Sequence, residues 1–132
     1  MSSAVNELLV AIQARLEGDA GLAALIGAGG LRDRRARGLD LPALVLGVVE
    51  ARDYSTASEA GFEILLTLEA WSAEGRRETE AIGHAVRGLL DDADLALAAH
   101  TLVSLRHRRT VSRREAKTGF IVAEMAFRAV VE

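Results

Sequence analysis

The sequence predicts a single α+β domain, in which two helices pack on one face of a four-stranded, mainly antiparallel sheet. Three observations support this fold class. Two segments carry apolar residues at the three-and-four spacing of an amphipathic helix, and four segments are apolar on both faces or alternate like strands. They follow one another in the order α-β-β-α-β-β. The chain has 132 residues, enough for one hydrophobic core, and no repeat or linker divides residues 1–132.

The first helix is predicted from an apolar stripe that runs from Val5 to Leu16. Ser3 is a candidate N-cap because its hydroxyl can accept a hydrogen bond from the first helical turn, and Gly18 is a candidate stop. A short helical turn is expected to follow over residues 19–25. The prediction at this end of the chain is therefore one full helix and one turn.

A glycine-rich joint over residues 27–30 leads into the basic stretch 32–37. This stretch shows neither helical nor strand spacing, so it is predicted to be a solvated or partner-facing loop. A strand over residues 43–52 follows, with Pro42 at its start, where a sheet tolerates proline. Simple alternation places its apolar residues on two faces: Leu44, Leu46 and Val48 on one, Val45 and Val49 on the other.

The remaining elements are a strand, a helix and a hairpin. The strand over residues 62–71 alternates most clearly, and a polar loop precedes it. A helix is predicted from the stripe that contains Ile82, Val86 and Leu90, ending in the acidic run 91–94. A long hairpin then completes the chain, with its turn at residues 117–119.

The first strand of this hairpin is strongly basic. Alternation puts Arg106, Arg108 and Arg114 on one face and His107, Arg109 and Arg113 on the other. Because charge lies on both faces, this half of the hairpin is predicted to project from the body. Three interpretations stay open for it: a solvated arm, a nucleic-acid-binding arm, or an arm that docks on acidic surface of a neighbouring subunit. The candidate interface residues are Arg106, Arg108, Arg109, Arg113, Arg114 and Lys117, together with Arg32, Arg34 and Arg35.

Catalytic, metal and cofactor sites are not predicted. The chain has no cysteine, its three histidines lack metal-ligand spacing and are expected to be solvated, and no nucleophile elbow occurs. The glycines at residues 27–30 lack the Gly-Lys-Ser/Thr ending of a phosphate loop. The net charge of −3 argues against a general nucleic-acid binder. Neither a signal peptide nor a membrane span is indicated, so we expect a soluble protein made in the cytoplasm.

Four stretches of the sequence are distinctive when taken in order: residues 16–27, residues 41–56 with their Leu-Pro start, residues 68–72 with the Trp71-Ser72 pair and the helix that follows, and the hairpin that ends at residues 127–129. Together they resemble a family of small phage tail-completion proteins that is also found in gene transfer agents. The likeness spans nearly the whole chain, although no single motif is diagnostic. The basic stretch 32–37 departs from the family, in which a short strand is expected at that place.

The resemblance implies a structural virion protein similar to the tail terminators of long-tailed phages. Such a protein forms a hexameric ring, caps the tail tube, ends its polymerisation and joins it to the head connector or stopper. DNA passes through the ring without specific binding, and the location is the virion tail or neck. The alternative from the residues alone is a small dimeric α+β module that binds a ligand or nucleic acid.

Overall fold

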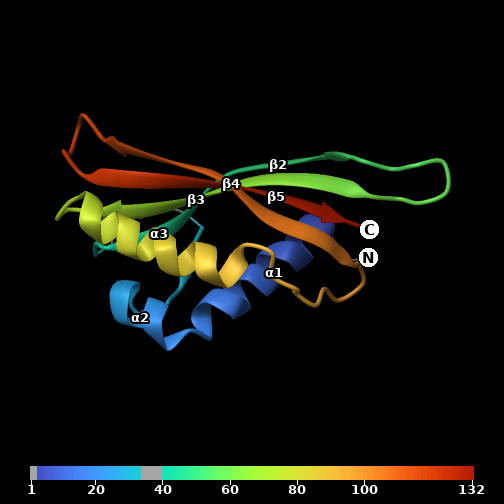
Figure 1. Ribbon diagram of the computed structural model, residues 1–132, viewed down its shortest axis with the longest axis horizontal. Helices are drawn as coiled ribbons and strands as arrows, with labels where there is room; N and C mark the ends of the chain where they lie inside the picture. The colour runs from blue at the N-terminus through green and yellow to red at the C-terminus, as the bar shows by residue number, and fades with distance from the viewer. Residues whose placement is uncertain (1–2, 34–39) are drawn as a thin grey trace.

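The computed structural model describes residues 3–33 and 40–132, which form three helices on one side of a five-stranded sheet (Figure 1). The sheet order is β1-β2-β3-β5-β4. β1 runs parallel to β2, and every other neighbouring pair is antiparallel. In chain order the elements are α1 (Ala4–Glu17), α2 (Ala20–Ile26), β1 (Leu31–Arg32), β2 (Ala43–Asp53), β3 (Phe62–Ser72), α3 (Arg76–Leu90), β4 (Leu102–Arg114) and β5 (Ile121–Val131).

Both N-terminal helices begin at side chains that cap them. The Ser3 hydroxyl accepts a hydrogen bond from the backbone N–H of Asn6 at 3.3 Å, and Asp19 Oδ2 accepts one from Leu22 N at 2.8 Å. α2 stops at Gly27, whose φ of 86° suits a residue without a Cβ. The short turn expected after the first helix is thus a complete helix, so the prediction of two helices is one too few.

The predicted four-stranded sheet is also one strand short. β1 contains two residues, Leu31 and Arg32, which pair with Leu44 and Val45 of β2. Such a short strand has no periodicity that a sequence can display, because its strand character comes from pairing with β2. The sheet is therefore mixed, and the predicted order α-β-β-α-β-β lacks both α2 and β1.

A bulge in β2 changes which of its side chains reach the core. Leu46 pairs with Leu68 and Val49 pairs with Leu66, so β2 has one more residue than β3 between these two pairs. Val49 consequently packs against the core beside Leu46, while Val48 is 70% exposed. Strict alternation had placed Val48 with Leu46 and Val49 opposite, and the bulge makes that expectation wrong.

The main core lies between the three helices and one face of the sheet. α1 and α3 each contribute an apolar stripe, and β3 and β5 contribute alternate residues that face the helices. A second, smaller cluster on the opposite face contains Ala43, Val45, Trp71 and Val122. The largest fully buried side chains of the main core include Leu8, Ile12, Leu16, Leu22, Leu44, Ile64, Leu68, Ile82, Leu90, Leu105, Met125 and Phe127.

The C-terminal hairpin does not project, contrary to the prediction. β5 pairs along its whole length with β3, as far as the pair Ser72 and Ile121, and β4 pairs with β5 over the same span. The hairpin is thus an integral part of the sheet. The loop between β2 and β3 is the segment that extends past the body (Figure 1).

Candidate protein–protein interface

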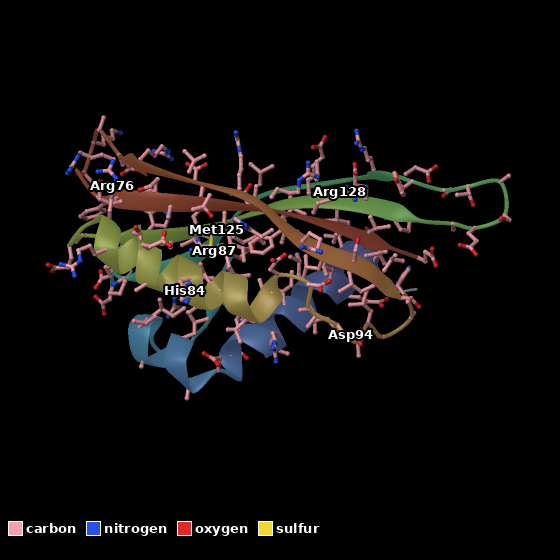
Figure 2. All side chains as sticks on the ribbon, in the orientation of Figure 1. Arg76, His84, Arg87, Asp94, Met125 and Arg128 are labelled. Carbon is pink, nitrogen blue, oxygen red and sulfur yellow. The ribbon has the colours of Figure 1, made fainter. Side chains whose placement is uncertain are left out.

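The face of the sheet turned away from the helices carries most of the charged side chains of β2 to β5. On β3 the residues on this face alternate with the core residues, and Glu63, Thr67 and Glu69 lie here. On β5, Glu124 and Arg128 also lie on this face, because they pair with outward-facing residues of β3. Figure 2 shows Arg128 on this side, whereas Met125 lies between the sheet and α3. We call this surface the open face.

A second bulge gathers the arginines of β4 onto the open face. His107 pairs with Phe127 and Arg109 with Ala126, so Arg108 is one residue in excess on β4. Arg109 and Arg113 therefore share the open face with Arg106. The prediction that charge occupies both faces of this strand assumed uninterrupted alternation, and for residues 106–113 it is wrong.

The other face of β4 is mostly uncharged and is covered by α3. His107 packs edge-on against the Phe127 ring, with 5.4 Å between the ring centroids. Arg87 Nη1 donates to the Thr110 hydroxyl at 3.3 Å, and Arg76 Nε donates to the Ser112 hydroxyl at 3.2 Å. This covering explains why the basic strand remains in the body of the protein.

Glu63 is the most buried charged group of the open face, at 4% exposure. Its carboxylate accepts hydrogen bonds from Arg128 Nε, at 2.5 Å, and from Arg52 Nε. These bonds, chiefly the one from Arg128, hold the pKa of Glu63 below its ordinary value, and the same bond raises the pKa of Arg128. The Arg128 guanidinium also lies 5.5 Å from the centre of the Tyr54 ring. Glu63 thus joins β2, β3 and β5 by charge-assisted hydrogen bonds.

Two more arginines of β4 have carboxylate partners. Arg113 Nε donates to Glu124 at 2.6 Å, which raises the pKa of Arg113. Arg106 Nε donates to Asp91 at 3.1 Å, and the backbone N–H of His107 donates to the same carboxylate at 2.9 Å. These bonds, led by the one from His107, lower the pKa of Asp91. In addition, Asp92 N donates to the carbonyl of Leu105 at 2.8 Å, so residues 91–92 cover part of the outer edge of β4.

Arg108 and Arg109 differ from their neighbours. Both are exposed, and within residues 3–33 and 40–132 neither has a hydrogen bond or an ion pair. They line one side of a shallow groove on the open face, whose other side includes Val48, Glu50 and Arg52. Two guanidinium groups without partners are available to donate hydrogen bonds to acidic groups of another molecule.

The structure distributes the predicted interface residues over four places. Arg106, Arg108, Arg109 and Arg113 lie together on the open face. Arg114 lies at the end of β4 on the other face and donates to the carbonyl of Gly119. Lys117 is exposed in the hairpin turn, and Arg32 is exposed on β1 at the opposite edge of the sheet. Arg34 and Arg35 lie outside the described residues.

Sequence reasoning missed Glu63, Arg52 and Arg128 as part of this surface. Arg52 and Glu63 occupy outward positions of their strands, and a cross-strand pair of opposite charge is a signal that could have indicated their contact. Arg128 required the order of the strands, because it reaches Glu63 only when β5 lies next to β3.

His100 is the polar group whose surroundings differ most from expectation. Its Nδ1 lies 3.0 Å from Glu7 Oε2, and the backbone N–H groups of Ala99 and His100 donate to the other oxygen at 2.7 and 3.1 Å. These bonds, led by that from Ala99, lower the pKa of Glu7. His100 was expected to be solvated, but it anchors the loop before β4 to α1.

Metal ions in proteins are held by groups of His, Cys, Asp or Glu side chains. Residues 3–33 and 40–132 contain no group of three or more His, Cys, Asp or Glu side chains placed for this purpose. In the same residues, no helix is long and apolar enough to cross a membrane. The surface with the most developed chemistry is thus the arginine-lined open face, which is suited to binding another macromolecule.

Comparison with known proteins identifies the family. The model of the family described as "Tail completion protein gp17" matches residues 10–132. The chain belongs to this family. Tail completion proteins of this kind are structural components of the phage tail. A comparison with curated protein sequences gave no match.

Among solved structures, the tail completion protein described here is similar to a chain from the "Virion of native gene transfer agent (GTA) particle". The two chains are 30% identical and superpose with a TM-score of 0.88. The match covers 100% of this chain and 99% of the other. The likeness therefore includes the whole sheet and all three helices.

Proposed function

We propose that this tail completion protein forms a ring at the end of the tail tube, where it ends polymerisation of the tube and joins it to the head connector. The observation that carries the proposal is the match along the full length of the chain to a component of a gene transfer agent virion.

The surface of the chain supports assembly with other copies. The open face has no helix over it, and two of its arginines lack partners within the described residues. The two edges of the sheet, β1 with β2 on one side and β4 on the other, are different surfaces. A chain that joins neighbours through two different surfaces makes head-to-tail contacts, which close into rings when the rotation between copies permits. Six copies per ring is the number that the family resemblance implies.

The proposed partners follow from this position in the particle. One side of the ring contacts the tail-tube protein, and the other contacts the head connector or stopper. DNA passes through the ring without sequence-specific contacts. A net charge of −3 fits that role, because an acidic ring does not retain the phosphate backbone.

The experiment removes the gene from a phage or gene transfer agent that encodes the chain and examines the particles by electron microscopy. We expect tails of uncontrolled length and heads without tails, and the purified chain should restore joined particles of uniform tail length. Uniform tails joined to heads in the absence of the protein would refute the proposal.

A further inference from the structure

The tip of the β2–β3 hairpin, residues 54–61, is an ordered arm that stands clear of the body (Figure 1). Backbone bonds close it twice, from Tyr54 N to Gly61 O and from Thr56 N to Glu59 O, each at 2.9 Å. The Ser55 hydroxyl also accepts from Gly61 N at 3.1 Å. Residues 51–60 are all exposed. An arm held by its own bonds loses little conformational entropy when it docks, so it is prepared for binding.

The arm is acidic. Asp53, the last residue of β2, and Glu59 are exposed on it, and Glu59 has no ion-pair partner among the described residues. Hydrogen bonds from Ser55, first from its hydroxyl and then from its N–H, hold the pKa of Asp53 below its ordinary value. Arg52, the one basic residue of this segment, is engaged with Glu63. The arm therefore presents uncompensated negative charge.

The unpaired positive charge of the open face lies elsewhere on the molecule, at Arg108 and Arg109. Arg109 is level with Ala126 and, through it, with Thr67 of β3. The arm begins beyond Phe62, five residues farther along β3, or about 17 Å away at the rise of a strand. Beyond Phe62 the chain leaves the sheet, and the tip of the hairpin extends past the body (Figure 1). Glu59 at the tip therefore does not meet Arg108 and Arg109 within one copy.

We propose that the acidic arm of one copy docks on Arg108 and Arg109 of the next copy. The inference rests on the proposed ring and names the surfaces that build it. Each copy then offers one arm and receives one, which is a head-to-tail contact. The bulge at Arg108 places two adjacent guanidinium groups beside the groove, and Val48 and Leu65 supply apolar surface next to them. Complementary charge fixes the partner and its orientation.

Cysteine cross-linking tests the contact directly, because the chain has no cysteine of its own. The double variant Ser58→Cys with Arg109→Cys carries one thiol on the arm and one at the receiving surface. A disulfide needs Cα atoms within about 7 Å, so bonds within one copy are excluded by the separation along β3. Purified protein and completed tails should both yield a reducible ladder of linked copies on mild oxidation, and each single variant should not.

A double variant that cross-links no more than the single variants, in both samples, would overturn the inference. Efficient dimers from Ser58→Cys alone would also overturn it, since arms would then meet arms. If the double variant still completes tails of uniform length without a ladder, the proposed function stands and only the docking surface is wrong. Tails that remain uniform without any copy of the protein would instead contradict the proposed function.

Charge reversal supplies the matched control. Glu59→Arg, or Arg108→Glu with Arg109→Glu, should each lower tail completion about tenfold or more, and all three changes in one chain should restore most of it. Arg108→Lys with Arg109→Lys keeps the charge and should retain most of the activity. Failure of the triple variant to recover, with its fold intact by circular dichroism, would contradict the contact. Duplex-DNA binding that is lost on Arg108→Glu with Arg109→Glu, without any loss of tail completion, would assign these arginines to nucleic acid instead.

Discussion

The bulge at Arg108 predicts how single-residue deletions in β4 change the stability of the protein, whatever its function. Deleting Arg108 leaves His107 opposite Phe127 and Arg109 opposite Ala126, which is the alternation of a regular strand. Every other side chain keeps its face. The stability should change by less than about 1 kcal/mol, as for surface changes that disturb no core contact.

Deleting Val111 has the opposite consequence, although this residue is itself 43% exposed. If the strand shortens before position 111, Arg109 moves opposite Met125 and beneath α3; if it shortens after, Arg113 moves opposite Ala123. Either way an arginine enters the face covered by α3, where Arg87 already lies against Thr110. An unpaired charge on a buried face costs about 3 kcal/mol or more.

Thermal unfolding followed by circular dichroism distinguishes the two deletions. For 132 residues the unfolding entropy is roughly 0.28 kcal/mol/K. The deletion of Val111 should therefore lower Tm by about 11 °C or more, and that of Arg108 by less than about 4 °C. Equal losses for the two variants, or a harmless deletion of Val111, would refute the assignment of Arg108 as the bulge residue.

Three further predictions concern the core, the open face and a helix start. Phe127→Ala should cost about 3–5 kcal/mol in urea unfolding, because the ring is 1% exposed, whereas the matched control Val103→Ala at 52% exposure should cost little. Glu63→Gln should destabilise the protein at about pH 7, but much less at about pH 3. The pKa of Glu63 is held below 4.5, so the stability it adds is present above about pH 4.5 and is lost as the pH falls through the lower folded-state value. Asp19→Ala should lower stability by about 1 kcal/mol by removing the cap on Leu22 N, measured by the same unfolding assay.

The parts of the fold that follow local rules could be predicted from the sequence. The stripes of α1 and α3 and the alternation of β3 and β5 depend on which side chains face one core, and that information is periodic along the chain. β1 could not be predicted, because a strand of two residues exists only through its pairing with β2.

The sequence indicated which residues of β4 belong to the candidate interface, but it did not indicate how they are arranged on the sheet. The arginines of β4 were named as candidate interface residues from their number, yet their common face depends on the bulge at Arg108 within a strand of 13 residues. Bulges have no reliable signature in a single sequence, since either register satisfies the backbone until the neighbouring strand is known. The Glu63 contacts needed the adjacency of β3 and β5, which no local pattern supplies.

The hydrogen bonds of Asp91 and Asp92 to the outer edge of β4 have a consequence for how copies of this protein behave at high concentration. Leu105 O and His107 N already take part in these hydrogen bonds. A strand from another copy therefore cannot pair with β4 over its full length, and the longest stretch of β4 that remains for such pairing starts after residue 107. Sheets that can be extended without limit grow into fibrils. Asp91 and Asp92, which follow α3, interrupt the free edge of β4. This interruption disfavours unlimited strand addition and favours association into closed assemblies.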